Sequence, residues 1–239
     1  YKALELMISD SKSALTIIDK IKAEDIQIIL SSKYEAYWPW IKEFESDGGK
    51  VNLMIHDGHK YLDSKFRNDL IRCKDMGIVN KIGVSLYETD HLEKILDKGG
   101  LDIVQIPISL ADRRFASKRI IDKLISSQIE VHARSVFLQG IIINLPKNSI
   151  IENDAYKEKF DQYQKYASIK NTRISIALAS VSKELDCSLV IGTDSIDQLK
   201  SLCHSYSNLK NISVKSINEC RKIWANLPPE IIDPRKWKR

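Results

Sequence analysis

Short runs of apolar residues alternate along the chain with longer segments whose apolar residues recur at helical spacing. KIGVSLY (81–87) and LDIVQIPIS (101–109) are two such runs, and the segment between them places Leu92, Ile95 and Leu96 on one helical face. Two strands joined through a helix are typical of a parallel βαβ unit, whose strands are almost continuously apolar because both faces of the sheet are covered. The pattern therefore predicts a parallel α/β sheet.

The same alternation extends over nearly the whole chain. Strands are predicted to begin near residues 26, 51, 81, 102, 129 and 188. Helices are predicted over 2–22, 60–77, 117–128, 153–168, 171–185, 195–206 and 213–227, and between the apolar runs 81–87 and 101–109. The natural closed form of such a series is a (β/α)8 TIM barrel, of about 250 residues. We therefore expect a barrel whose first strands are missing from this sequence, and the alternative is an open, doubly wound sheet.

Composition favours a single domain over residues 1–239, because 43% hydrophobic residues suffice for one large core. No run approaches the roughly 18 apolar residues of a membrane helix, and the first residues do not resemble a signal peptide. Cysteines without CxxC spacing indicate reduced thiols. We expect a cytoplasmic protein without a membrane partner. The basic tail 233–239 is compatible with nucleic acid, but a solvated end is favoured, so no nucleic-acid partner is predicted.

Polar residues interrupt the apolar runs near their carboxyl ends, where parallel α/β folds place their ligand sites. Lys33 follows the first strand, His56 the second, and Ser85 and Gln105 lie in the next two. Each residue also has a structural interpretation. Lys33 is then a surface lysine whose ammonium group reaches water, His56 a structural histidine, and Ser85 and Gln105 polar groups that cap strand ends. His56, with His59, lacks further ligands nearby, so no metal is expected.

Four segments, in order, resemble the aldo-keto reductase family. They are SSK after the first strand, LMIHD around His56, GIVNKIGVS with DIVQIP, and RSVFLQG (134–140) before IGTDSIDQL (191–199). DRRF (112–115) after QIPISLA, together with RSVFLQG, resembles one bacterial branch of the family. The resemblance implies one partial barrel domain over 1–239 that binds a nicotinamide cofactor and reduces a carbonyl by hydride transfer.

The resemblance also implies a set of residues that supply the proton. Lys33 and His56 match the family lysine and histidine, and Tyr1, 32 residues before Lys33, matches the tyrosine of a Tyr-Gly-x-x-Glu motif in which Lys2 replaces the glycine. A lysine ammonium beside a tyrosine favours the phenolate and so lowers the tyrosine pKa. The family aspartate that holds the lysine is not found in this sequence.

The family's cofactor positions are matched by residues of the later strands and loops. Ser85 and Gln105 match the residues that bind the nicotinamide carboxamide, although Leu86 replaces a frequent asparagine. Arg134 replaces an aromatic residue that stacks on the nicotinamide, which a planar guanidinium can also do. The positions around the pyrophosphate are Ser135, Phe137, Gln139 and Gly140, and those around the adenosine phosphate are Gly192, Thr193, Ser195 and Gln198.

The turn 192–199 opens a helix, whose free N–H groups favour an anion, although Ser195 alone is equally compatible with an N-cap. NADPH is expected and NADH is possible. The leading hypothesis is a reductase of a small aldehyde, ketone or sugar-like carbonyl. The alternatives are a non-catalytic binding or assembly module on the same fold, and an open α/β protein that binds phosphate at 192–199. The pattern specifies neither the particular carbonyl nor an oligomeric state.

Overall fold

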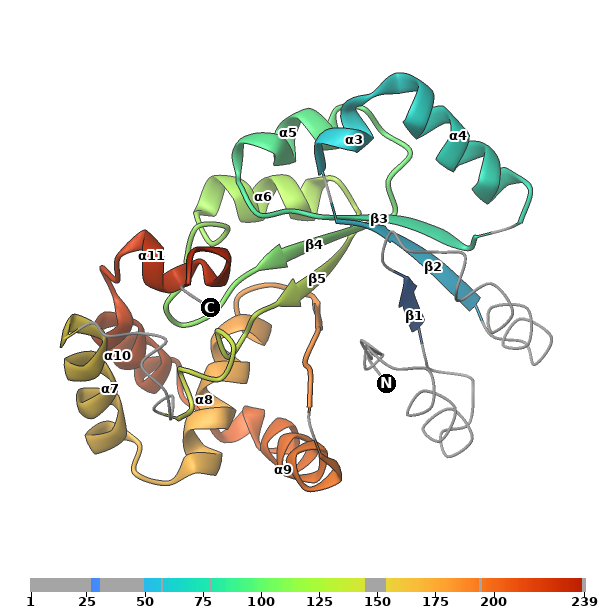
Figure 1. Ribbon diagram of the computed structural model, residues 1–239. Coiled ribbons are helices and arrows are strands. Elements are labelled where there is room, and N and C mark those ends of the chain that lie inside the picture. Colours follow the sequence, from blue (N-terminus) through green and yellow to red (C-terminus); the bar gives the residue numbers. More distant parts are fainter. Residues whose placement is uncertain are drawn as a thin grey trace. The chain divides into compact units, whose positions relative to one another are not determined.

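The computed structural model describes residues 27–30, 50–56, 58–77, 79–144, 154–193 and 195–237. In these residues six strands form one sheet in the order β1-β2-β3-β4-β5-β6 (Figure 1). The strands are β1 Gln27–Leu30, β2 Lys50–Ile55, β3 Lys81–Ser85, β4 Ile103–Pro107, β5 Glu130–Arg134 and β6 Ser188–Leu189. Every described strand lies within a run that the sequence pattern identified or begins within one residue of it. The last run, predicted as a strand over 188–192, forms the strand β6 over two residues only.

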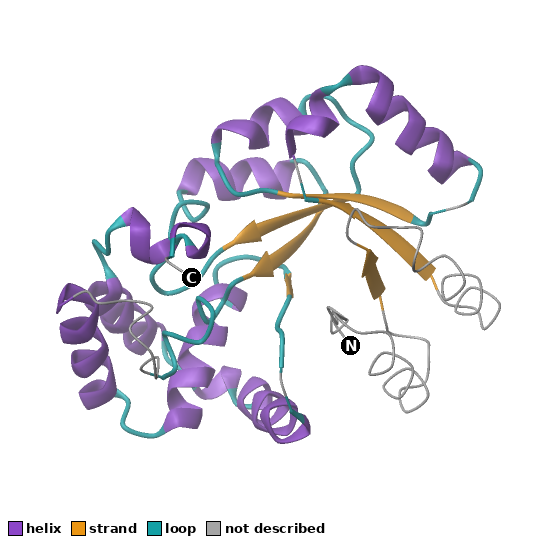
Figure 2. Cartoon of the chain, viewed as in Figure 1, coloured by secondary structure: helices purple, strands orange, loops and turns teal. Residues whose placement is uncertain are grey.

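Helices alternate with the strands (Figure 2). They are α3 Gly58–Leu62, α4 Ser64–Asp75, α5 Asp90–Leu96, α6 Lys118–Ser126, α7 Asp154–Tyr166, α8 Lys170–Ser182, α9 Ile196–Ser207, α10 Val214–Trp224 and α11 Pro229–Ile232, with 3-10 helices η4 Leu209–Asn211 and η5 Pro234–Lys236. The described residues fall into two compact units. The first contains the residues up to Ile106 with Lys118–His132 and Cys187–Gly192, and the second contains the rest.

The strands run parallel. β1 pairs with β2, β2 with β3 and β3 with β4 in parallel register. Between β4 and β5, the amide of Glu130 donates to the carbonyl of Asp102 (3.0 Å) and the amide of Ile108 to that of Arg134 (3.1 Å). Residue numbers rise together along both segments, so this pair is parallel as well. The prediction of a parallel α/β sheet is confirmed.

In the first unit, α3, α4, α5 and α6 cover one face of the sheet (Figure 1). Val84 and Leu86 face this helix layer, because a Cβ on Gly58 at the start of α3 would lie 2.9 Å from Leu86 and 3.5 Å from Val84. Side chains alternate along a strand. Gly83 therefore faces the other side of the sheet, where it meets Met54.

One predicted helix is wrong: segment 60–77 forms two helices, α3 and α4. Asp63 separates them, because its backbone is extended (φ −67°, ψ 123°) and its Oδ1 accepts a hydrogen bond from the amide of Phe66 at 2.8 Å. This is an N-cap, and the sequence pattern alone did not reveal it. The predicted helix stop at Gly77 is confirmed, since this glycine adopts φ +73°.

The second unit contains a cluster of aromatic side chains from two helices. Trp224 of α10 lies between Tyr156 and Tyr163 of α7, with ring-centroid distances of 6.0 and 5.5 Å. All three side chains are buried, and such aromatic pairs contribute about 0.5–1.5 kcal/mol each beyond the area that they bury. The helices predicted over 153–168, 171–185, 195–206 and 213–227 are confirmed with small changes of their ends. The helix predicted over 2–22 lies outside the described residues.

Candidate functional site

Ser85, the last residue of β3, lies beside Gln105 in the middle of β4. They are register partners, and the Ser85 hydroxyl donates a hydrogen bond to Oε1 of Gln105 at 3.1 Å. Both side chains are almost fully buried, with exposed fractions of 1% and 3%. The backbone holds the pair as well, since the amide of Leu86 donates to the carbonyl of Gln105 at 2.8 Å. The structure therefore brings together two residues that the sequence assigned to one site.

The chemistry of this pair fits a carboxamide. A hydroxyl has one donor and two acceptor lone pairs, and a primary amide has two donors and an acceptor oxygen. A nicotinamide carboxamide has an oxygen that accepts and a nitrogen that donates, so its site needs one hydrogen-bond donor and one acceptor. The residues present fit this group.

His56 lies at the same level of the sheet. It follows β2 directly and is half-buried. Ile55 is the register partner of Val84, and Ser85 is the partner of Gln105, so His56, Ser85 and Gln105 follow one another across three neighbouring strands. The other two predicted catalytic residues, Lys33 and Tyr1, lie outside the described residues.

Arg134 is the last residue of β5 and is half-buried. Its Nη1 donates to the hydroxyl of Ser135 at 3.3 Å, and its carbonyl is held by the amide of Ile108. The strand predicted to begin near residue 129 ends at Arg134, because Ser135 adopts φ +58°, a left-handed conformation that cannot continue a strand.

The turn after β5 has an unusual backbone. Leu138 and Gln139 adopt φ +46° and +55°, and Gly140 adopts φ +87°. A left-handed conformation costs a residue with a side chain roughly 1–2 kcal/mol, and such residues concentrate at binding sites. Phe137 is half-buried and Gln139 is exposed. The turn thus contains all four residues that the sequence assigned to the pyrophosphate.

Two hydrogen bonds from the helices of the second unit fix the segment Ile141–Ile143, directly after this turn. Tyr156 of α7 donates to the carbonyl of Ile141 at 2.9 Å, and Nε of the buried Arg173 on α8 donates to that of Ile143 at 3.2 Å. Burial raises the pKa of Tyr156, so its hydroxyl remains a donor at neutral pH. The left-handed turn is held by these contacts and by the buried side chains of the segment.

Ser195 is the N-cap of α9, because its Oγ accepts a hydrogen bond from the amide of Gln198 at 3.2 Å. The N-cap interpretation of Ser195 is therefore correct, and it leaves open whether an anion also binds at this helix end. Before it, Gly192 is exposed and Thr193 is half-buried.

The loop after β4 contains a charge network that the sequence pattern did not reveal. Asp112, 1% exposed, accepts from Nε and Nη2 of Arg114 at 2.9 and 2.8 Å. Nη2 of Arg113 lies 2.5 Å from both carboxylate oxygens of Glu184, and Arg221 also donates to Glu184 at 2.8 Å. The sequence DRRF contains no signal for this network, because the spacing of charged residues along the chain does not distinguish buried charges from exposed ones.

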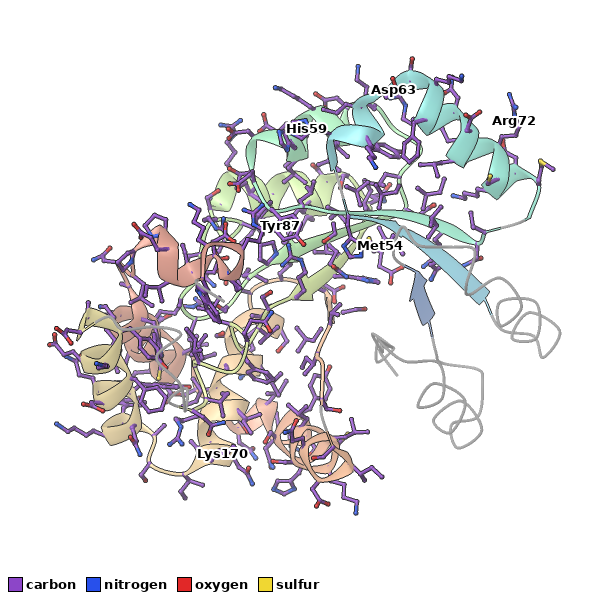
Figure 3. All side chains as sticks on the ribbon, viewed as in Figure 1. Met54, His59, Asp63, Arg72, Tyr87 and Lys170 are labelled. Carbon is purple, nitrogen blue, oxygen red and sulfur yellow. The ribbon has the colours of Figure 1, made fainter. Side chains whose placement is uncertain are left out.

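His59 contacts another histidine. Its ring, on α3 (Figure 3), lies with its centroid 3.9 Å from that of His91 on α5. Among the described residues, no three His, Cys, Asp or Glu side chains come together as metal ligands. A search of the same residues for a helix that is long and apolar enough to cross a membrane finds none.

The parallel strands and the intervening helices define an α/β barrel protein, a fold that places its ligand sites at the carboxyl ends of the strands. A family model described as "Aldo/keto reductase family" matches residues 12–225, and the chain belongs to this family. A comparison with curated proteins gave no match.

Solved structures of several aldo-keto reductases have the same fold. The holo form of aldo-keto reductase AKR11C1 from Bacillus halodurans is 14% identical, with a TM-score of 0.69 over 93% of this chain and 81% of that one. The glycerol dehydrogenase AKR11B4 from Gluconobacter oxydans is 15% identical (TM-score 0.60; 83% and 71%). The aldose reductase from Schistosoma japonicum is 13% identical (TM-score 0.59; 93% and 79%). The (β/α)8-barrel fold expected from the sequence is confirmed, and the family makes the chain an oxidoreductase of small carbonyl compounds.

Proposed function

We propose that this protein is an NADPH-dependent reductase of an aldehyde, a ketone or a sugar-like carbonyl. The observation that carries the proposal is the buried pair of Ser85, at the carboxyl end of β3, and Gln105 of β4, level with His56. Parallel α/β folds place their ligand sites beyond the carboxyl ends of the strands, and a few convergent polar groups are typical of such sites. The cytoplasmic, bacterial setting expected from the sequence is part of the same proposal.

The chain's own residues position the reactants and supply the proton. Ser85 and Gln105 hold the carboxamide and so fix the orientation of the nicotinamide ring, which supplies the hydride when the cofactor is bound. His56 donates a hydrogen bond to the carbonyl oxygen. Tyr1 transfers its hydroxyl proton to that oxygen, assisted by Lys33, whose ammonium favours the phenolate that remains. These roles of Tyr1 and Lys33 rest on the family resemblance alone.

Arg134 stacks on the nicotinamide ring in this proposal. The other cofactor-binding positions contact the phosphates of the cofactor. The pyrophosphate is assigned to Ser135, Phe137, Gln139 and Gly140, and the adenosine phosphate to Gly192, Thr193, Ser195 and Gln198. NADPH is preferred to NADH on the family pattern, and Lys200 adds a positive charge near the start of α9.

Arg134, in place of an aromatic residue, favours a second candidate, a non-catalytic member of the fold that binds cofactor without turnover. Turnover distinguishes the two candidates, because both bind NADPH. Binding is measured by quenching of tryptophan fluorescence. Turnover is measured by the loss of reduced nicotinamide absorbance with a panel of aldehydes, ketones and sugars.

The decisive variant is His56→Gln, with His204→Gln, an exposed change on α9, as the control. Loss of a hydrogen-bonding acid–base group costs about 10²-fold or more in kcat/KM, and we expect this loss for His56 only. Cofactor binding without turnover of any carbonyl supports the second candidate. An absence of NADPH and NADH binding at millimolar concentrations contradicts both.

A further inference from the structure

The sequence motif Asp-x-Arg occurs twice in the second unit with the same hydrogen bonds. In the loop after β4, Asp112 accepts from the backbone amide, Nε and Nη2 of Arg114, at 3.2, 2.9 and 2.8 Å. Near the carboxyl end of the chain, Asp233 accepts from the same three groups of Arg235, at 3.1, 2.8 and 2.5 Å. Each motif is a closed turn held by one carboxylate.

An ion pair joins the two turns. Nη1 of Arg114 lies 3.8 Å from Oδ2 of Asp233, so the four charges alternate in sign from Asp112 through Arg114 and Asp233 to Arg235. The side chains of Asp112 and Asp233 are 1% and 4% exposed. Buried charges are retained where partners compensate them, and removing one partner leaves an uncompensated charge. The hydrogen bonds from Arg235 lower the pKa of Asp233, so its carboxylate stays charged at neutral pH.

The same loop is held at a second point. Arg113 binds both oxygens of Glu184, which follows α8. Within the loop, the amide of Asp112 donates to the hydroxyl of Ser109 and the amide of Ala116 to the carbonyl of Arg113. Loops after the carboxyl ends of strands form the active sites of barrel enzymes, and this loop begins two residues after Gln105.

We propose that the segment Asp233–Trp237 is a positioning element that holds the loop Pro107–Ser117 through Arg114 and thereby determines how well a carbonyl substrate binds. This inference rests on the proposed function for its effect on the substrate, but the holding of the loop is independent of it. The segment acts on the loop conformation, so cofactor affinity does not depend on it.

The test compares Asp233→Asn, Arg114→Gln and the double variant in the full chain. Lys236→Gln, an exposed change on η5, is the matched control. Hydrogen exchange is measured at the amides of Asp112, Arg114 and Ala116, which are hydrogen-bonded within the loop. We expect Asp233→Asn to accelerate their exchange about ten-fold in the wild-type chain and to have no further effect in the Arg114→Gln background, because the ion pair between Arg114 and Asp233 is already absent there. Unchanged exchange in Asp233→Asn, or effects that multiply in the double variant, overturns the proposal.

The second readout is kinetic. We expect the KM for the carbonyl to rise several-fold in Asp233→Asn, with unchanged dissociation constants for NADPH, and Asp233→Glu to restore the wild-type KM in part. A parallel loss of cofactor affinity, or an unchanged KM, contradicts the effect on the substrate. If the wild-type chain binds no cofactor, the proposed function fails, whereas hydrogen exchange still decides whether the segment holds the loop.

Discussion

The methyl carbon of Met54 occupies the space that a side chain on Gly83 would need. The two residues are register partners on β2 and β3, and a Cβ on Gly83 would lie 2.6 Å from Cε of Met54 and 3.1 Å from Cβ of Ile103. Met54 is buried (Figure 3), so its side chain has little room to move. The absence of a side chain at Gly83 therefore leaves room for the side chains of Met54 and Ile103 on the two neighbouring strands.

Replacement of Gly83 by alanine is expected to lower the free energy of unfolding by about 1–3 kcal/mol, the usual cost of overpacking a core. Urea denaturation measures this loss. Met54→Ala removes the clashing atoms, so the double variant loses less stability than the two single variants together. Gly192→Ala is the control, since a Cβ there meets no atom within 4 Å. Additive effects of Gly83→Ala and Met54→Ala contradict the prediction.

Glu130, at the amino end of β5, joins Lys81 and His132. The hydrogen bond from Nε2 of His132 (2.8 Å), together with Lys81 and against the effect of burial, lowers the pKa of Glu130 from 4.5 to about 2. A carboxyl with a lowered pKa in the folded state stabilises the fold above its unfolded pKa, and this stabilisation is lost as the pH falls towards its folded pKa.

The Glu130→Gln variant is therefore expected to melt at a lower temperature than the wild type at neutral pH. Its melting temperature should also lack the part of the wild-type decrease that falls between pH 4.5 and about 2. Thermal melts across this range measure both effects. Glu158→Gln, an exposed change on α7, should keep the wild-type profile. Parallel pH profiles of Glu130→Gln and the wild type would show that Glu130 is not the group responsible.

Glu184 compensates two guanidinium groups in the second unit, those of Arg113 and Arg221. Replacement by alanine leaves both cations without this partner, and we expect a loss of about 2–4 kcal/mol in the free energy of unfolding, near the range for broken buried pairs. Glu219→Ala breaks an exposed pair with Lys222 and should be close to neutral. Equal effects of the two variants in urea denaturation would argue against a structural role for Glu184.

Ser85→Ala and Gln105→Ala are expected to weaken NADPH binding by about ten-fold each, because a lost hydrogen bond in a buried site costs about 1–2 kcal/mol. Fluorescence titration measures the dissociation constants. Ser126→Ala, on the exposed part of α6, is the control. Unchanged affinity in both Ser85 and Gln105 variants excludes the pair as the carboxamide site.

The strands and most helices were predictable because their signal is local. β3 and β4 are continuous apolar runs, and α8 and α10 carry apolar residues at helical spacing. The helix and strand ends that were predicted wrongly are determined by the backbone conformation of single residues. Ser135 ends β5 with a left-handed conformation, which serine rarely adopts and which no residue pattern indicated. Asp63 as an N-cap was in principle readable from its residue type.

The candidate site was predictable only in part. Residue type and position at a strand end were enough to select Ser85 and Gln105, whose hydrogen bond the structure adds. The network of Asp112, Arg114 and Asp233 joins positions more than a hundred residues apart, so no local pattern contains it. The assignments of Lys33 and Tyr1 stay predictions.

The ends of the strands differ in chemistry. Lys81 and Glu130, with Lys74 and Asp102, form ion pairs where the strands begin, whereas the uncharged Ser85–Gln105 pair lies where they finish. Directed evolution of thermal stability can therefore concentrate on the amino ends of these strands, where exchanging lysine for arginine alters no residue assigned to catalysis or cofactor binding. A library restricted to these positions would separate gains in thermal stability from changes in substrate preference.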